Sequence, residues 1–191
     1  RMVKFHNFHQ TVQEYYCRGK ENLFPTLINC PQPDCSYHGR LRFHGFYTRN
    51  ALTLNGTFLI VIQRYLCPSC KHTVSLLPSF LAPRFQYALT VIFFTLFRMI
   101  INHLPLEQVA RLVGAFPGHQ AISHQHLVFY RKRFLANLPL ILGFLGSKEL
   151  VFSEDSHTRL QAILHQICRY PLPVFHLEYF WVQARSCLSK S

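Results

Sequence analysis

The spacing of hydrophobic positions in this 191-residue chain changes near residue 80. Before that point, the segments 41–52 and 57–66 are rich in aromatic and β-branched residues, which favour strands. Asn55-Gly56 lies between them, and this dipeptide is typical of tight hairpin turns because both residues tolerate positive φ angles. The pattern therefore predicts a β-hairpin in the first half of the chain.

After the proline-punctuated linker 76–85, apolar residues recur with helical spacing. We expect an apolar helix over Tyr87–His103, stopped by a following proline. A short amphipathic helix is expected over Leu106–Val113, with Gly114 in a left-handed conformation at its end. A third helix is expected from about Gln120 to Asn137.

In the last part of the chain the spacing of hydrophobic residues is less regular. We expect a helix around 155–169, a break at "YPLP" and a further aromatic segment, which packs on the helical domain or pairs with another subunit. The fold class is therefore α+β: a small β-hairpin module, a mostly helical domain and a helical tail. The expected divisions are 1–28, 29–80, 84–146 and 150–191.

Charge narrows the choice of partners. Twenty Lys and Arg residues stand against eight Asp and Glu residues, for a formal net charge of +12. A surface of this charge favours polyanions, with nucleic acid first and a membrane surface as the alternative. The longest apolar run, Tyr87–Phe97, is shorter than the roughly 20 residues that span a bilayer. The N-terminal "RMVKFHNFHQ" lacks the apolar stretch of a signal peptide, so we expect a cytoplasmic, nucleoid-associated protein.

Four of the seven cysteines are paired along the chain: Cys30 with Cys35, and Cys67 with Cys70. Two such pairs can each supply one edge of a zinc tetrahedron, and the hairpin between them brings its two ends together. This arrangement predicts a zinc ribbon with one structural Zn²⁺. The nearby histidines His38, His44 and His72 are alternatives for one ligand. The unpaired Cys17, Cys168 and Cys187 are interpreted as core residues.

Because four protein ligands leave no open position, the expected zinc cannot activate water. Its role would be to hold together a sheet that is too small to be stable alone. The hairpin module also carries basic side chains, which either contact phosphates or only solvate the sheet. They are Arg40, Arg42, Arg49, Arg64 and Lys71.

The helices over 106–113 and 120–137 resemble a helix-turn-helix, although the connector is longer than in the tightest versions. An ordinary helical hairpin is the alternative. The apolar residues Ile122, Leu127, Tyr130 and Phe134 would point inward. The side chains then available to DNA are Ser123, His124, Gln125, Val128, Arg131, Lys132 and Arg133. His119, His124 and His126 also allow a second metal site, but no carboxylate or thiolate accompanies them.

Together, "CPQPDC", "HGFYTRN", "IQRYLCPSCKHTVSLLPSFLAPRF" and "LEQVARLVG" resemble the zinc-ribbon plus helix-turn-helix region of bacterial insertion-sequence transposases and related stand-alone bacterial proteins. The resemblance covers about residues 29–137. It implies recognition of DNA ends, or a regulator derived from a transposon, with the four paired cysteines as zinc ligands and 120–137 as recognition helix.

The chain lacks the features of a complete transposase. Two-metal strand transfer needs several convergent carboxylates, and only Glu149, Glu154, Asp155 and Glu178 follow the predicted recognition helix. We therefore expect a non-enzymatic protein that binds duplex DNA, as a homodimer or in a larger nucleoprotein assembly, with no membrane and no small-molecule substrate. The alternatives are a zinc-ribbon adaptor for protein or ribonucleoprotein partners and the DNA-binding fragment of a larger transposase.

Overall fold

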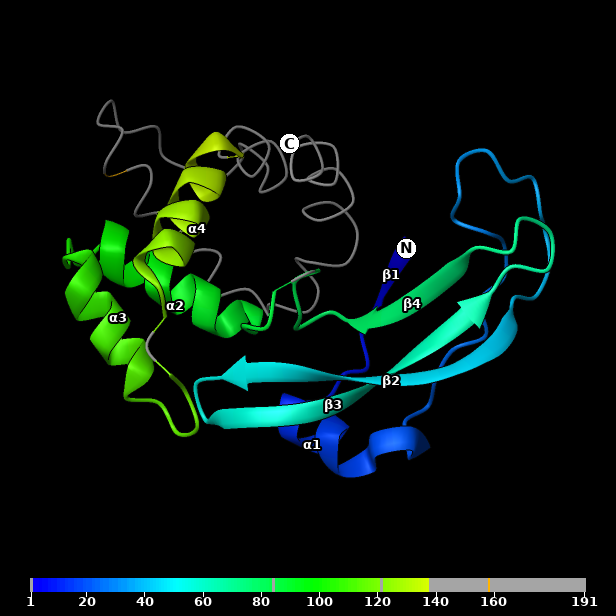
Figure 1. The fold of residues 1–191 in the computed structure, drawn as a ribbon, viewed down its shortest axis with the longest axis horizontal. Helices are drawn as coiled ribbons and strands as arrows, with labels where there is room; N and C mark the ends of the chain where they lie inside the picture. Colours follow the sequence, from blue (N-terminus) through cyan, green and yellow to red (C-terminus); the bar gives the residue numbers. More distant parts are fainter. Residues whose placement is uncertain (1, 84, 121, 138–157, 159–191) are drawn as a thin grey trace. The chain divides into compact units, whose positions relative to one another are not determined.

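The computed structural model describes residues 2–83, 85–120, 122–137 and 158 of the chain. They form an α+β structure with a four-stranded mixed sheet and four α-helices (Figure 1). The chain divides into two units, one of residues 1–53 and 57–88, and the other of residues 54–56 and 89–191. Apart from Thr158, the expectations for the tail, including the helix at 155–169 and its carboxylates, lie outside the described residues.

The first unit is built on a sheet whose strand order is β1-β4-β3-β2. Its long hairpin consists of β2 (Arg42–Thr53) and β3 (Gly56–Leu66), as the sequence predicted. Strand β4 (Thr73–Pro78) pairs antiparallel with β3, with Tyr65 opposite Val74. Strand β1 (Met2–His6) was not predicted; it pairs parallel with β4, with Met2 opposite Val74.

The hairpin turn differs from the expected one. Gly56 has a φ of +145°, but Asn55 is not among the residues with positive φ. Strand β2 ends at Thr53 and β3 begins at Gly56, so Leu54 and Asn55 form the turn. The glycine therefore carries the unusual conformation alone, directly after the turn.

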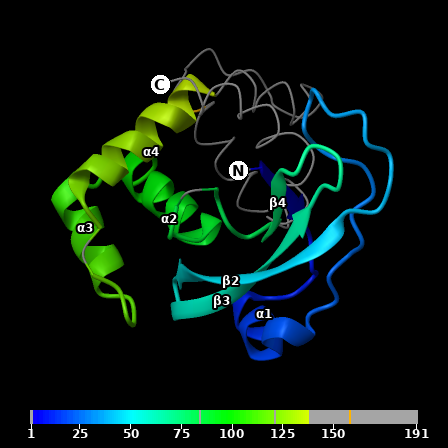
Figure 2. The same ribbon diagram turned by 45° about the vertical axis from the view of Figure 1, so that its right-hand side comes forward.

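Helix α1 (Val12–Arg18) covers one face of the sheet, as Figures 1 and 2 both show. It starts with a capping box, in which Thr11 and Glu14 each bond the other's backbone N–H group. It ends at Gly19, which has a φ of +53°, and a short 3-10 turn, η1 (Gly19–Glu21), follows. Tyr15 is completely buried and donates its hydroxyl hydrogen to the Val61 carbonyl at 2.8 Å.

The sheet unit has two clusters of buried side chains. One, which we call the α1 core, lies under the helix; its members are Tyr15, Ala51, Ile60, Ile62, Leu77 and Leu81. The other, which we call the loop-end core, lies next to the two cysteine pairs. Its members are Leu27, Leu41, Tyr65, Val74 and Leu76. The clusters use alternate positions of β3 and β4, so the sheet is buried on both faces here.

The second unit contains α2 (Leu89–Ile100), α3 (Leu106–Gly114) and α4 (His124–Ala136), which pack against one another. Helix α2 is shorter than expected at both ends. It begins after Ala88, whose N–H group bonds the Leu52 carbonyl in the sheet unit. At its C-terminal end His103 has a φ of +52° and the Leu104 N–H bonds the Arg98 carbonyl, which is a Schellman-type ending.

Two further expectations were wrong in detail. Gly114 lies inside α3 without a positive φ, and the left-handed glycine is Gly118, at +72°. Helix α4 begins at His124 rather than near Gln120, because Ser123 has an extended backbone and its hydroxyl caps the helix by accepting the His126 N–H. Among the described residues, no helix combines the length and apolarity needed to cross a bilayer.

Candidate metal centre and helical surface

The first cysteine pair lies in a loop that is closed by backbone pairing before β2. Ile28 forms an antiparallel bridge with Arg40 at the base of this loop. Inside it, the Asn29 N–H bonds the Gly39 carbonyl at 3.1 Å, and the Cys30 N–H bonds the Tyr37 carbonyl at 3.2 Å. These bonds point the Cys30 end of the loop toward the end of the hairpin.

The second cysteine pair lies in the tight connection between β3 and β4. The Cys67 N–H bonds the His72 carbonyl at 3.0 Å, and the Lys71 N–H bonds back to the Cys67 carbonyl at 3.1 Å. Lys71 has a φ of +58°, which lets the chain reverse directly after Cys70. The spacing of the two cysteines and this reversal direct both thiols to the same side.

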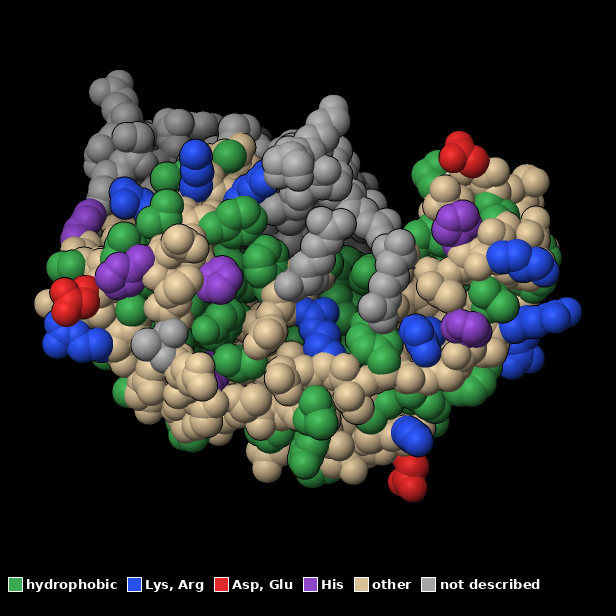
Figure 3. Space-filling view, viewed as in Figure 1, with side chains coloured by type: hydrophobic (Ala, Val, Ile, Leu, Met, Phe, Trp, Pro, Cys, Tyr) green, Lys and Arg blue, Asp and Glu red, His purple; other side chains and the backbone are tan. Residues whose placement is uncertain are grey.

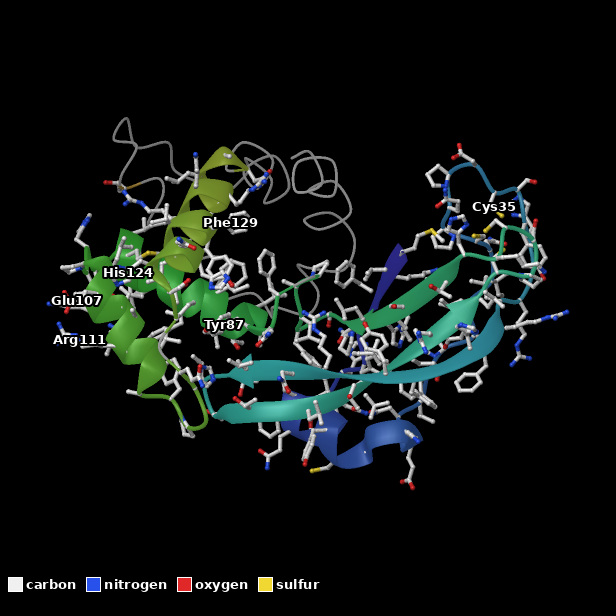
Figure 4. The ribbon with its side chains drawn as sticks, viewed as in Figure 1. Cys35, Tyr87, Glu107, Arg111, His124 and Phe129 are labelled. Carbon is white, nitrogen blue, oxygen red and sulfur yellow. The ribbon has the colours of Figure 1, made fainter. Side chains whose placement is uncertain are left out.

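The four sulfur atoms form one compact cluster, visible beside Cys35 in Figure 4. All lie within 4.8 Å of one another. The Cys30 and Cys70 sulfurs are 3.6 Å apart, and the Cys35 and Cys67 sulfurs are 3.8 Å apart. With Zn–S bonds of about 2.3 Å, a regular tetrahedron has edges of about 3.8 Å. The cluster can therefore hold a metal ion, and all four thiols are free of disulfides.

The surroundings shift the pKa values of the Cys30 and Cys67 thiols in opposite directions. Burial raises the pKa of the Cys30 thiol to about 12. Burial also acts to raise the pKa of Cys67, but the backbone N–H groups of Cys70 and Ser69 and the nearby thiols lower that pKa to about 7. Cys67 is thus more easily ionised than Cys30, and a soft cation that binds there displaces the remaining protons from its neighbours.

The alternative histidine ligands are not part of this cluster, which within the described residues contains only cysteines. His72 has its Nδ1 atom 3.1 Å from the Cys70 carbonyl oxygen instead. Sequence reasoning missed the residues that shape the loops. Asn29, at a φ of +71°, precedes the first ligand, and Lys71 follows the last one. Only at Asn29 could the left-handed conformation have been expected from the sequence, because Asn adopts positive φ angles more readily than Lys does.

The basic residues of the sheet unit have different surroundings. Arg40, Arg42 and Lys71 are exposed. Arg49 is half-buried, and its guanidinium donates to the carbonyls of Ala82 and Phe85. The Arg64 guanidinium lies 5.8 Å from the centre of the Tyr47 ring. The structure therefore leaves the first three side chains available to a partner, whereas Arg49 fixes the segment before α2.

Helix α4 has one buried and one exposed face. Ile122, before the helix, and Leu127, Tyr130 and Phe134 are buried, as predicted. Ser123 is exposed but engaged, since its hydroxyl caps the helix and contacts His126 Nδ1 at 3.0 Å. Arg133 is half-buried, with its guanidinium 5.3 Å from the Phe129 ring centre. The other predicted contact residues are exposed: His124, Gln125, Val128, Arg131 and Lys132.

The neighbouring helix adds little negative charge to this surface. Glu107 is the only acidic residue in the sequence between positions 89 and 137. Its carboxylate oxygen lies 3.3 Å from the guanidinium of Arg111, which is also on α3 (Figure 4). Both side chains are 73% exposed, so the pair contributes little to stability but neutralises the carboxylate. Figure 3 shows Lys, Arg and His side chains over α3 and α4.

Comparison with known proteins adds one relationship. Residues 30–108 match a family described as a domain of unknown function, DUF6431. The match spans both cysteine pairs, strands β2–β4 and α2, and it ends within α3. No curated protein matches the chain, and no solved structure matches it either.

Proposed function

We propose that the protein binds duplex DNA through helix α4, and that a structural Zn²⁺ held by the four cysteines stabilises the sheet unit. The observation that carries the DNA proposal is the exposed face of α4. Its first turn presents His124 and Gln125, whereas Arg131 and Lys132 follow two turns later, on a helix whose opposite face is buried.

This arrangement matches what a major-groove reader needs. A helix that enters the groove by its N-terminal end brings the first polar side chains to base edges. Gln is suited to adenine, to which it can make two hydrogen bonds. The cationic side chains further along then lie near the backbone and contact phosphates irrespective of sequence. The first turn of α4 has no acidic residue, so its N-terminal N–H groups also favour phosphate.

The zinc assignment follows from the ligand chemistry. Four thiolates in tetrahedral spacing favour zinc over magnesium or calcium, which prefer oxygen ligands. All four positions would be protein atoms, so the ion would have no site for a substrate or a reactive water. The proposed role is to fix the ends of the two loops and the exposed Arg40, Arg42 and Lys71 around them. Transposon ancestry, a homodimer or a nucleoprotein assembly and a nucleoid location remain part of this proposal.

The test compares two substitutions on α4 with matched controls. Bound sequences are first selected from a random duplex pool, and binding of the best sequence is then measured at several salt concentrations. Gln125→Ala should flatten the preference at one base pair, at a cost of about 1–3 kcal/mol for the preferred base, with the salt slope unchanged. Lys132→Ala should weaken all duplexes alike and lower the log–log salt slope by about 0.9.

The controls remove the same chemical groups elsewhere. Gln108→Ala changes an exposed glutamine on α3, and Lys4→Ala changes an exposed lysine on β1. Neither should alter base preference. If Gln125→Ala and Lys132→Ala leave affinity, preference and salt slope unchanged, α4 is not the reader and the adaptor function replaces this proposal.

The proposal assigns no chemical reaction to the chain. Incubation of the purified protein with supercoiled DNA and Mg²⁺ or Mn²⁺ should leave the DNA intact. Cleavage that is lost in Glu154→Ala or Asp155→Ala would show instead that the chain is a nuclease.

A further inference from the structure

A row of aromatic rings leads from the interior of the sheet unit to its surface at the start of β2. Phe8 contacts the buried Tyr15 with ring centres 4.8 Å apart, and Phe24 contacts Phe8 at 5.7 Å. Phe46 lies 5.6 Å from Phe24, and Phe43 lies 5.2 Å from Phe46. Phe43 is 60% exposed, although it is one of the largest apolar side chains. We call Phe24, Phe43 and Phe46 the aromatic platform.

The backbone of β2 is adapted to build this platform. Residues 43 and 46 are three positions apart, and in a regular strand they would point to opposite faces. Gly45 between them has a φ of +98°, which resets the alternation and lets both rings lie on one face. A Cβ at this position would have no atom within 4 Å, so the glycine serves the backbone conformation and not a close contact.

One cation contacts the platform, and others are exposed next to it along the chain. The Lys20 ammonium lies 5.8 Å from the centre of the Phe46 ring. Arg42 and His44, the neighbours of Phe43 along the chain, are exposed, as is Arg40. A regular strand directs positions 42 and 44 to the face opposite Phe43, so their long side chains reach the platform around the edge of the sheet, where β2 is the last strand in the order. Lys, Arg and His side chains gather over this end of the sheet unit in Figure 3. The acidic residues between 2 and 78 are only Glu14, Glu21 and Asp34, and Glu14 is bonded to Thr11.

We propose that the aromatic platform binds single-stranded DNA by stacking an unpaired base on Phe43, while Lys20 and Arg42 hold the flanking phosphates. A ring that is exposed, fixed from below by other rings and bordered by cations is the arrangement that single-strand binders use. The cations favour a polyanionic strand over an apolar protein partner, because the phosphates beside a stacked base pair with them, whereas an apolar partner offers no opposite charge.

This inference goes beyond reading of a duplex by α4. It gives the sheet unit a separate role, in which a base that is unpaired at a DNA end or in an opened duplex is held by stacking. The choice of DNA over RNA rests on the proposed function, whereas the stacking itself follows from the platform alone.

The experiment uses the full chain loaded with zinc and a fluorescent oligothymidine of about 12 nucleotides, within the range covered by single-strand modules. Phe43→Ala should weaken binding about 5- to 150-fold, which is the usual loss for one stacked base. Phe43→Trp should bind at least as well as the wild type. Tyr16→Ala, which removes another ring of the same unit that is 48% exposed, should have no effect.

Two further measurements separate stacking from charge. On an abasic strand with the same phosphates, wild type and Phe43→Ala should bind equally. Lys20→Gln should instead lower the salt slope by about 0.7 for both strands. Irradiation of a 5-bromouracil strand should cross-link the peptide that contains Phe43.

The inference is overturned if Phe43→Ala binds oligothymidine as tightly as the wild type, or if the cross-link falls outside β2. It is also overturned if the substitution affects only an RNA strand. The α4 variants Gln125→Ala and Lys132→Ala separate this failure from that of the proposed function. They should change duplex binding and leave the ratio between Phe43→Ala and wild type on oligothymidine unchanged.

Discussion

Removal of the proposed zinc should open the two cysteine loops and leave the rest of the sheet unit folded. The loop at 29–39 shows how large this effect is. Ordering its backbone costs about 10–20 kcal/mol. Three backbone bonds inside it, donated by Asn29, Cys30 and Cys35, return only about 2–5 kcal/mol. Zinc bound by four thiolates contributes an apparent free energy of about 10–16 kcal/mol, already net of the ordering that binding requires, so the ordered loop depends on the metal.

The α1 core does not depend on the metal in the same way. Tyr15, Ile60 and Ile62 are completely buried, and α1 and β1 cover them without any contribution from the cysteine loops. We therefore expect local opening and not global unfolding. This differs from the prediction made from the sequence, in which the metal holds together a sheet that is too small to be stable alone.

Amide hydrogen exchange measures both parts in one experiment. After chelation, the amides of Asn29, Cys30 and Lys71 should exchange at nearly unprotected rates, while those of Ile60 and Ile62 stay protected. Added Zn²⁺ should restore the loops, and elemental analysis should find one zinc per chain before chelation. The variant Cys67→Ser should behave like the chelated protein.

The control is Cys17→Ser. Cys17 was interpreted from the sequence as a core residue, but it is exposed on α1. Its loops should remain protected until the chelator is added. Protected loops in metal-free protein would show that the cysteines are not a structural metal site. Loss of protection in the α1 core as well would show that the sheet cannot stand without the metal.

Three other substitutions test particular contacts. Arg49→Gln should lower the free energy of unfolding by about 1.5–3 kcal/mol, because a charged donor to two carbonyls is lost. The salt slope of DNA binding should not change. A reduced salt slope with unchanged stability would instead make Arg49 a phosphate contact. Gly45→Ala should cost about 1–2 kcal/mol in thermal unfolding, since its φ of +98° disfavours any side chain, and no loss would contradict that reason. Hydrogen bonds donated by Thr11 lower the pKa of Glu14 in the folded protein. The carboxylate therefore stabilises the fold at pH values above its unfolded pKa, near 4.5. This stabilisation is lost as the pH falls through the lower pKa of the folded state. Glu14→Ala should therefore be less stable than wild type at neutral pH and equally stable in acid; a difference that persists in acid would disprove the linkage.

The cysteine site was predictable because its geometry is local. Each pair is held by a short loop, and the strands between the pairs have a clear β pattern. The cysteine spacing and the hairpin together were therefore enough to predict that the four sulfurs lie close to one another. Strand β4 was not predicted because "TVSLLP" ends in a proline and runs directly into the linker at 76–85. Strand β1 was not predicted because its partner, β4, is distant in the sequence.

The helix ends show a different limit. His103, Gly118 and Ser123 determine where α2 ends, where the connector turns and where α4 begins, through single backbone conformations and one hydroxyl cap. Spacing of apolar residues does not contain this information, since it identifies the buried face but not the first or last turn. The role of Arg49 was equally hidden, because its two acceptors belong to a segment more than 30 positions away.

The parallel pairing of β1 with β4 has a consequence for synthesis on the ribosome. Residues 2–6 are the first part of the described sheet to be made. Among the described strands β4 is their only neighbour, and it leaves the ribosome after the hairpin. The N-terminal strand must therefore wait with its backbone groups unpaired until nearly the whole unit has emerged. Pairs of such large sequence separation close slowly. The rate of folding should thus be set by the docking of β1, and the nascent chain exposes an open edge of β4 during the delay.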